Sequence, residues 1–505
     1  MMKIRRLIVT ILIACLAVTA LTSSARAEPV QDEIVTMDEA LTVANNWISL
    51  MIHNEGDWGG FEAAEVAEIY EFKRGDRILG YFCRVEPTGF IVVSLRKELA
   101  PVKAYSTRVC VDADSDEEFT EVIKIRMEGI LDAIEQEIGP VQLARSEDVE
   151  RVLETNHRPT WDELGGDTRT FKVVLESGEA KMDYQEGEEL ISSVWHQNEP
   201  YNRWCPQLVG AEACDHAKVG CVATAAAQIM RYWAWPPYGV GSPYNDRYDW
   251  PNMPDSLTVY SPLAQIYAVA ELCYEVGKAA GTDYGCSGSD AWLGAKPGTD
   301  MRDAYEDKFR YNENTDFEQR WHYSSTEEWF NIIKNNINAN QPLQYGLLDV
   351  SVGGGFAAHS MVADGWMVVG STRFVHMNYG YGYTCTWEDI TNLPGAEGMI
   401  RKIRPAPSLG SWLSGVYSPP SFPYRYFNRD ATGHDATFDA GHYLQFLPGV
   451  TVKCTSPDGG KIQFRGWSTD NTYLFARGDT STGIRIHSGH IYLYQNGSIR
   501  FDQPE

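Results

Sequence analysis

The sequence lacks the features of nucleic-acid-binding proteins and of multi-spanning membrane proteins. It is short of positive charge, because 43 Lys and Arg residues stand against 69 Asp and Glu residues, for a formal net charge of −26. Such an excess of negative charge repels nucleic acids and anionic membrane surfaces. After the first 27 residues, no apolar run is long enough to span a bilayer. With 43% hydrophobic residues, the 505-residue chain can otherwise bury normal cores, and its length predicts two to four domains.

Cysteines are few, and no two of them form a C-x-x-C pair. Four soft metal ligands fall within 17 positions, namely Cys205, Cys214, His216 and Cys221. Their irregular spacing argues against a structural zinc ion, so a Cys205–Cys214 disulfide in a surface loop is the preferred interpretation. We expect no metal and no other cofactor.

An acidic stretch imitates the start of a calcium-binding loop at Asp112, Asp114 and Asp116. Such a loop needs glycine where Glu117 stands and a bidentate carboxylate where Ile123 stands. The stretch is therefore interpreted as a solvated acidic turn before a helix.

The first 27 residues have the pattern of an export signal. A basic start is followed by an apolar run from Leu7 to Leu21, and Ala25-Arg26-Ala27 supplies a small-x-small cleavage site. A lipoprotein signal ending at Cys15 is less well matched, because the apolar run continues past that cysteine. We therefore expect a secreted protein that begins at Glu28, with cell-surface association as the alternative. Nine cysteines then remain, and an odd number leaves at least one thiol outside an intramolecular disulfide.

Residues 28–180 are expected to form a small α+β unit. Thr36-x-x-Glu39 has the spacing of a capping box and is followed by apolar residues at helical spacing. Short strands are expected between Ile69 and Ser94, and a second helix over Phe119–Ile138. A polar, glycine-containing stretch around Glu163–Glu189 is expected to be an exposed linker, the kind of segment that proteases cut.

Residues 181–404 are expected to form a second α+β unit, in which helices come first and strands later. Its helices are predicted over 221–233, 262–280 and 326–340, and its strands over 343–349, 359–369 and 372–379. From residue 405 onward the composition and the hydropathy pattern change. Five prolines fall between 405 and 423, and short alternating apolar runs follow them. Residues 405–505 are therefore expected to form a small all-β module, either a sandwich or a solenoid-like sheet.

The best candidate for a reactive residue is Cys221. Gly220 permits a tight turn, and the residues after Cys221 are strong helix formers. Cys221 is thus expected at a helix N-terminus, where the helix dipole and free N–H groups favour the thiolate. A buried structural cysteine is an equally good interpretation of this motif alone.

A thiol nucleophile needs a neighbouring base, and His359 is the best placed of the eleven histidines. It follows a glycine-rich stretch at the start of a predicted strand. It lies 138 positions after Cys221, which is the order and range of papain-like enzymes. Without Cys221, a half-buried strand histidine would be the better interpretation.

Two amide side chains could complete such a site. Asn378 could accept the ring N–H of His359 and fix its tautomer, and Gln197 could donate to an oxyanion together with the backbone N–H of Cys221. Each is a weak signal alone, since asparagine is common in turns and loop glutamines are usually solvated.

Together these segments resemble the streptopain family of bacterial cysteine proteases, which have a papain-like fold. The most specific match is the run Gly-Cys-Val-Ala-Thr-Ala-x-Ala-Gln-Ile-Met that begins at Gly220. Other matching stretches lie at 197–202, 249–253, 276–284, 329–345 and 354–382. The family pattern Asn-Trp-Gly-Trp-Gly occurs here with Tyr379 and Tyr381 in place of both tryptophans.

The resemblance implies a cysteine endopeptidase made as a zymogen, with Cys221 as nucleophile, His359 as base, Asn378 as orienter and Gln197 as oxyanion donor. Residues 89–94 and 100–107 resemble the family's propeptide, so the implied organisation is a signal peptide (1–27), an inhibitory propeptide (28–180), a papain-like protease domain (181–404) and an accessory β module (405–505). The expected partners are protein or peptide substrates and the chain's own propeptide, without nucleic acid or a membrane span.

Two alternatives use the same residues. The chain could be a non-catalytic surface or binding protein on a protease scaffold, with the β module as its binding part. It could also catalyse a different acyl transfer, such as transglutamination, with the same constellation. Fold alone does not separate these functions.

Overall fold

The computed structural model describes most of the chain up to residue 405 and the strands beyond it. The described residues are 33–109, 111, 118–178, 182–210, 213–236, 238–349, 355–393, 395–405 and ten strand segments between 412 and 501. The expected signal peptide with Cys15 and Glu28, and the acidic stretch Asp112 to Glu117, lie outside them. We call residues 33–178 the N-terminal unit and residues 182–405 the central unit.

The N-terminal unit combines five helices with four strands. Its helices are α2 (Met37–Glu55), α3 (Glu118–Ile138), α4 (Ser146–Val152), α5 (Arg158–Leu164) and α6 (Thr168–Ser177), and its strands are β1 (Glu65–Arg74), β2 (Arg77–Glu86), β3 (Phe90–Ser94) and β4 (Val102–Ser106). The predicted capping box is confirmed, because the Thr36 hydroxyl accepts from the N–H of Glu39 and the Glu39 carboxylate accepts from the N–H of Thr36.

The central unit follows the predicted order of helices and then strands. Its elements are β5 (Tyr184–Glu186), α7 (Cys221–Trp233), η2 (Trp250–Asn252), α8 (Leu263–Ala279), α9 (Met301–Asp307), β6 (Asp316–Gln319), η3 (Arg320–His322), α10 (Thr326–Asn338), β7 (Leu343–Leu348), β8 (Ala357–Val369), β9 (Thr372–Asn378), β10 (Cys385–Asp389) and β11 (Glu397–Arg401). The predicted helix 221–233 is confirmed to the residue, and the other predicted elements agree within about two residues.

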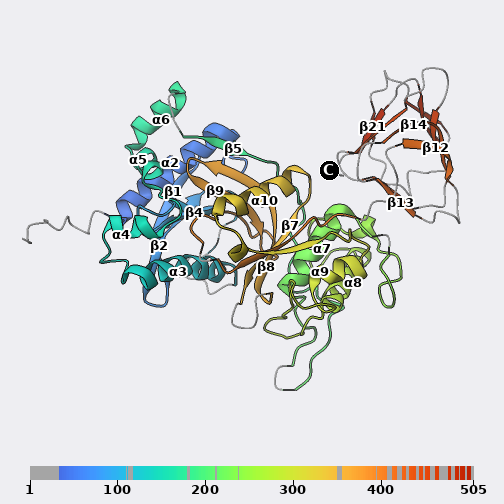
Figure 1. Ribbon diagram of the computed structural model, residues 1–505, viewed down its shortest axis with the longest axis horizontal. Helices are drawn as coiled ribbons and strands as arrows, with labels where there is room; N and C mark the ends of the chain where they lie inside the picture. The colour runs from blue at the N-terminus through green and yellow to red at the C-terminus, as the bar shows by residue number, and fades with distance from the viewer. Residues whose placement is uncertain are drawn as a thin grey trace, which may run out of the picture.

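One antiparallel sheet runs through both units. Its strand order is β1-β2-β3-β4-β10-β9-β8-β7-β11-β6, and β5 pairs with the end of β8. The two units join where β4 pairs with β10, with Tyr105 opposite Trp387 and Ala104 opposite Glu388. Figure 1 shows this sheet in the middle of the molecule, with the N-terminal helices at one end and α7, α8 and α9 gathered at the other.

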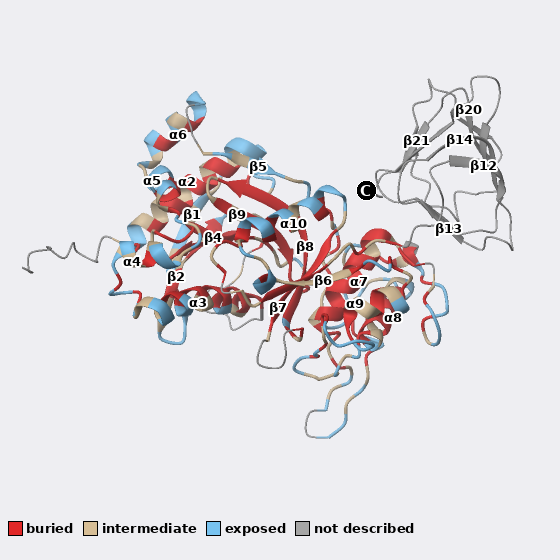
Figure 2. Cartoon of the chain, viewed as in Figure 1, coloured by how far each residue is buried: buried red, intermediate tan, exposed pale blue. Residues whose placement is uncertain are grey.

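Helices cover both faces of the sheet where the units meet. Alternate residues of β3 point to opposite sides, so Ile91 and Val93 pack with α2, whereas Phe90 and Val92 pack with α3. Every residue of β3 is therefore buried, which explains its continuous apolar sequence. In Figure 2 the inner strands β8 and β9 are mostly red, while the helices of the N-terminal unit carry pale blue on their outer sides.

The predicted linker around Glu163–Glu189 is corrected by the structure. It contains the end of α5, all of α6 and the strand β5. Phe171 and Leu175 of α6 are buried in the same cluster as α2, and Asp167 caps the helix by accepting from the N–H of Thr170. The interpretation as a linker failed because two apolar positions among polar residues are enough to dock a short helix.

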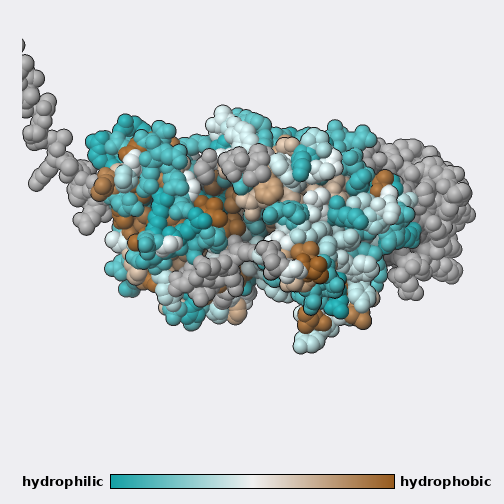
Figure 3. All heavy atoms as spheres, turned by 90° about the horizontal axis from the view of Figure 1, so that it is seen from below, coloured by the Kyte–Doolittle hydropathy of each residue, from teal (hydrophilic) through white to brown (hydrophobic). Residues whose placement is uncertain are grey.

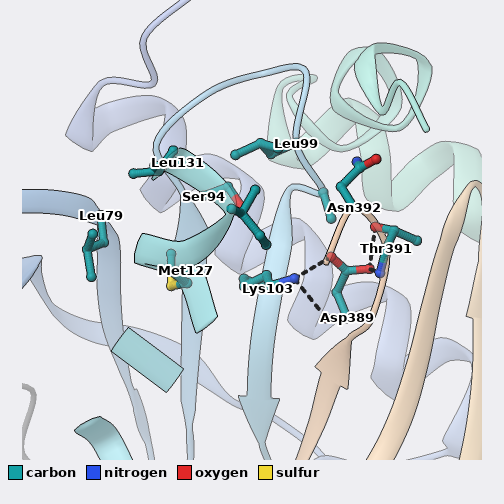
Figure 4. A pocket seen from close by; sticks show the side chains of 11 residues that line it. Leu79, Ser94, Leu99, Lys103, Met127, Leu131, Asp389, Thr391 and Asn392 are labelled. Atoms are coloured by element: carbon teal, nitrogen blue, oxygen red, sulfur yellow. Dashed lines mark hydrogen bonds and ion pairs between the residues drawn. The ribbon is translucent and has the colours of Figure 1, made fainter. Parts of the chain in front are cut away.

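Charged side chains cross the seam between β4 and β10. Lys103 donates to the Asp389 carboxylate at 2.9 Å and to its backbone carbonyl at 2.8 Å. Figure 4 shows this pair at the wall of a small pocket that α3 side chains, including Met127 and Leu131, also line. Arg126 of α3 forms a second ion pair with Glu388, and both side chains are almost fully buried.

His157 is a third buried polar contact between the units. Its Nε2 lies 2.9 Å from the hydroxyl of Thr391, and its Nδ1 lies 2.9 Å from the hydroxyl of Ser371. Burial lowers the pKa of His157 to about 4, because the charged imidazolium would lose its hydration there. The neutral ring is therefore part of how the two units dock.

Beyond residue 411 the described residues are all in strands. They are β12 (Trp412–Tyr417), β13 (Tyr424–Phe427), β14 (Ala431–Asp439), β15 (Tyr443–Phe446), β16 (Val450–Cys454), β17 (Lys461–Arg465), β18 (Ala476–Gly478), β19 (Ile484–His487), β20 (His490–Tyr494) and β21 (Ser498–Phe501). The pairs β12–β14, β13–β15 and β14–β16 are parallel. The pair β14–β17 is also parallel, whereas β16–β21, β17–β20, β18–β21 and β19–β20 are antiparallel, so the described strands form mixed sheets.

The surface seen in Figure 3 agrees with the polar composition. The view from below in Figure 3 is mostly teal, and the brown apolar areas are small. Across the described residues, no helix combines the length and the apolar character that a bilayer crossing requires.

The Arg126–Glu388 pair predicts a large effect of removing one partner. Arg126→Met leaves the buried Glu388 carboxylate without its counter-ion, and we expect a loss of about 3–5 kcal/mol in the free energy of unfolding. Arg74→Met is the matched control, because Arg74 pairs with Glu128 of the same helix but is well exposed, and should cost less than about 1 kcal/mol. Urea unfolding of the full chain measures the free energy of unfolding of both variants. Equal losses would contradict the stabilising role given to the buried Arg126–Glu388 pair.

The pKa of His157 predicts acid weakening of the folded chain. The folded pKa of about 4 lies below the ordinary value of 6.5, so the unfolded chain binds more protons between these values. The free energy of unfolding should fall as the pH drops from 6.5 to 4, by about 3 kcal/mol from this residue. In the His157→Gln variant, the free energy of unfolding should depend less on pH between 4 and 6.5. Its pH dependence above pH 7 should stay the same. If the variant keeps the wild-type pH dependence between 4 and 6.5, other titrating groups cause the acid weakening.

Candidate active site

The position of Cys221 depends on the glycine before it. Gly220 caps α7 with a φ of 90°, a conformation that residues with side chains rarely adopt. A Cβ at this position would also lie 2.8 Å from the carbonyl oxygen of Ser289. The helix behind Cys221 is buried on nearly all sides, from Val222 to Trp233. Cys221 thus stands at the N-terminus of a rigid helix, as predicted.

Cys221 is partly buried at the start of α7. Burial raises its pKa to about 11, while the backbone N–H of Ser360 lowers it and the Asp290 carboxylate raises it. Ser360 directly follows His359, so the predicted nucleophile contacts the strand that carries the predicted base. At neutral pH the thiol keeps its proton in this form of the chain.

His359 lies near the start of β8 and is 5% exposed. Its Nε2 is 3.2 Å from the carbonyl oxygen of Tyr379, and its ring stacks on the rings of Tyr379 and Tyr381 with centroids 5.6 and 5.4 Å away. A carbonyl oxygen only accepts hydrogen bonds, so Nε2 carries the proton in this contact. In the neutral ring Nδ1 is then the nitrogen that can accept a proton.

Asn378 is close to His359 in the fold but contacts other groups. Its side-chain N–H donates to the carbonyl of Ser193 at 2.8 Å and to the amide oxygen of Gln228 at 3.2 Å. Its oxygen accepts from Gly380 N–H at 3.0 Å and from the Gln228 amide at 3.2 Å. None of these bonds reaches the His359 ring, whose contact goes to the carbonyl of the next residue instead. Asn378 therefore shapes the turn that supplies that carbonyl.

Gln197 has a buried amide donor without an acceptor. The side chain is 4% exposed, and its Nε2 has no hydrogen-bond partner. Its backbone carbonyl accepts from the N–H of Val219 at 3.0 Å, two residues before Cys221. An unpaired buried N–H is costly and rare in native proteins, and such groups often have a functional reason. The Gln197 amide is therefore a donor that no other described group uses.

Sequence reasoning gave no role to Gln228, although it lies in the most specific motif. It is fully buried on α7, and its amide oxygen accepts from the N–H of Trp195, the hydroxyl of Ser193 and the amide of Asn378. It therefore ties the helix of Cys221 to the segment that carries Gln197 and to the turn after β9. A buried glutamine in an otherwise apolar helix was the available signal.

The N-terminal unit reaches this turn as well. Phe119 of α3 packs edge-on against Tyr379, with ring centroids 4.8 Å apart. The Tyr379 hydroxyl donates to Glu388, the partner of Arg126. Tyr379, which replaces a family tryptophan, is thus contacted by Phe119 at its ring and by Glu388 at its hydroxyl.

The expected Cys205–Cys214 disulfide is wrong. Cys214 pairs with Cys286, 72 positions away, and Cys205 is a buried free thiol. Within the described part of the chain, no group of three or more His, Cys, Asp or Glu side chains is arranged to hold a metal ion.

Comparisons with known proteins agree with the resemblance. Residues 195–386 match the model of the Peptidase C10 family. The chain is 24% identical over 356 residues to streptopain of Streptococcus pyogenes, an alignment covering 64% of this chain and 77% of streptopain. It is 24% identical over 344 residues to the thiol protease/hemagglutinin PrtT of Porphyromonas gingivalis, covering 65% of this chain but only 35% of PrtT. The chain thus spans about a third of that relative.

Two solved structures from Prevotella intermedia are also similar. A prointerpain A fragment has a TM-score of 0.47 at 20% identity and covers 67% of this chain and 99% of the fragment. Active interpain A cysteine protease has a TM-score of 0.36 at 27% identity and covers 43% of this chain and 95% of that protein.

The family match includes the most specific motif of the sequence, and it confirms the resemblance that the motif predicted. No comparison supports the non-catalytic alternative. Residues 195–386, which contain Gln197, Cys221, His359 and Asn378, thus match a family of cysteine peptidases, the Peptidase C10 family.

Proposed function

We propose that the chain is the precursor of a secreted cysteine endopeptidase. The observation that carries the proposal is the amide of Gln197, a buried donor without a partner beside the start of the helix that Cys221 begins. The export pattern of the first 27 residues supports secretion. The Cys214–Cys286 disulfide supports it too, because disulfides persist in oxidising compartments outside the cytosol.

In the proposed reaction, Nδ1 of His359 takes the proton of the Cys221 thiol. The thiolate attacks the carbonyl carbon of the scissile peptide bond, and the resulting oxyanion accepts hydrogen bonds from Gln197 and from the N–H of Cys221. The C–N bond then breaks as His359 gives its proton to the leaving amine. Water, deprotonated by His359, attacks the acyl-enzyme, and the acid product leaves as the thiol is restored.

The carbonyl of Tyr379 has a defined part in this scheme. It holds Nε2–H of His359, so the imidazolium that forms during the reaction keeps a hydrogen-bond acceptor. Asn378 and Gln228 act through this contact by fixing the turn, and we propose them as positioning residues rather than direct partners of the ring. Rings of Tyr379 and Tyr381 shield the contact from water.

The precursor is proposed to be inactive because the N-terminal unit holds the site in an unreactive state. Phe119 packs against the ring of Tyr379, and the Tyr379 hydroxyl donates to Glu388, which pairs with Arg126. Residues 1–27 would be the signal peptide, 28–180 the propeptide, 181–404 the protease domain and 405–505 an accessory module. Cleavage between α6 and β5 would separate the two units.

Replacing Cys221 tests the proposed nucleophile. We expect residues 28–505 to lose the N-terminal unit during incubation with a reducing agent, and the Cys221→Ala variant to stay intact, since alanine cannot form the acyl-enzyme. Cys385→Ala is the matched control, because it removes another partly exposed free thiol and should be processed normally. Gel electrophoresis and intact mass give the result. Cleavage of Cys221→Ala at the wild-type rate would overturn the proposal.

Replacing Gln197 tests the proposed oxyanion donor. Gln197→Ala should lower kcat of the processed enzyme by about 10²–10³-fold with little change in KM, because the lost hydrogen bond exists mainly in the transition state. Gln265→Ala on α8 serves as the control glutamine. Steady-state hydrolysis of a peptide substrate separates the two constants. A rise in KM at unchanged kcat would assign Gln197 to substrate binding instead.

A further inference from the structure

The Cys214–Cys286 disulfide joins two segments that both lead to the active site. Cys214 belongs to the stretch that ends at Gly220, immediately before Cys221. Cys286 belongs to residues 283–294, which we call the bridging segment. This segment has no helix or named strand, and Asp283 and Asp290 exchange two backbone hydrogen bonds that close it into a loop. Its shape therefore depends on its attachments.

The bridging segment is attached first to the residues before α7. The N–H of Lys218 donates to the carbonyl of Gly285 at 3.0 Å, and the Ser289 hydroxyl donates to the carbonyl of Lys218 at 2.7 Å. The same hydroxyl accepts from the N–H of Gly285 at 3.0 Å. Ser289 also approaches Gly220 so closely that no Cβ fits there. The segment thus forms the wall against which Cys221 is positioned.

The other end of the bridging segment is attached to the strand of His359. The N–H of Leu293 donates to the carbonyl of Gly355 at 2.9 Å, and Trp292 forms an isolated antiparallel bridge with Phe356. The rings of Trp292 and Phe356 are in edge contact, with centroids 5.6 Å apart. His359 follows three residues later. One short segment therefore contacts both the start of α7 and the start of β8.

Gln197 is connected to the same assembly. Its carbonyl accepts from Val219, which stands between Lys218 and Gly220. Movement of the stretch 214–220 would shift the amide of Gln197 and the thiol of Cys221 together. The disulfide is the covalent link between this stretch and the bridging segment, and the hydrogen bonds of Lys218 and Ser289 join the same two segments beside it.

We propose that the Cys214–Cys286 disulfide is a brace that sets the positions of Cys221, Gln197 and His359 relative to one another. The proposal rests on the proposed function for its catalytic consequence. Cys214 and Cys286 are positioning residues in it, acting through the bridging segment and not on the substrate. The disulfide stays intact throughout the reaction, and no electron transfer is involved.

The test compares the Cys214→Ser/Cys286→Ser double variant with the wild type as full chains and after processing. Cys273→Ala is the control, because it removes a buried free cysteine of α8 that takes part in no disulfide. Hydrogen exchange followed by mass spectrometry reports on the N–H groups of Val219 and Leu293, the donors that connect the brace to Gln197 and to Gly355. Peptide hydrolysis is measured per titrated active site, with mass spectrometry verifying that the wild-type disulfide survives the reductant used.

We expect the double variant to exchange at least about tenfold faster at both Val219 and Leu293, and to lose up to about 10²-fold in kcat while KM changes little, as a displacement near 1 Å would cause. Cys273→Ala should leave both readouts near the wild-type values. Unchanged exchange at Val219 and Leu293, or a kcat equal to that of Cys273→Ala, would overturn the brace.

Failure of the proposed function has a different signature. It would appear as absence of peptide hydrolysis in the processed wild type. The exchange measurement needs no activity, so it decides the structural part of the brace in either case.

Discussion

Hydrogen bonds between β4 and β10 hold together segments that are far apart in the chain, with Lys103 and Asp389 separated by 286 positions. Because side chains alternate along a strand, this register decides which residues face which core. Ala104 points into the cluster with α3, and Tyr105 into the cluster with α2. A slip of one residue would exchange the two sets. The buried charges of the seam and the contact of α3 with Tyr379 all depend on this pairing.

The elements that local patterns encode could be predicted from the sequence. The capping box at Thr36 and the helix beginning at Cys221 were found because the caps and the helix formers are adjacent in the chain. The helix α6 was missed, since only tertiary contact with α2 makes its few apolar residues meaningful. The predicted Cys205–Cys214 disulfide was wrong for a similar reason. Sequence spacing favoured Cys205 for Cys214, whereas the path of the bridging segment brings Cys286 to it.

The candidate site shows the same division between side-chain motifs and backbone geometry. The motifs around Cys221 and His359 identified the segments that the fold brings together through Ser360. The acceptor for the His359 ring could not be predicted, because it is the backbone carbonyl of Tyr379, and carbonyl groups have no sequence signature. Gln228 was overlooked because its partners come from two segments far from it in the chain, one with Ser193 and Trp195 and one with Asn378. Its importance appears only when α7 is packed against them.

The continuous sheet has a consequence for the proposed cleavage, which would remove the N-terminal unit. Strand β10 lies between β4 and β9 in the precursor and would then become an edge strand with unpaired backbone groups. Exposed edges invite pairing with other molecules, and proteins protect them with charged residues. Glu388 and Asp389, which pair with Arg126 and Lys103 across the seam, would then lose these cationic partners. The carboxylates of Glu388 and Asp389, which join the two units in the intact chain, would then disfavour pairing of this edge with a second copy.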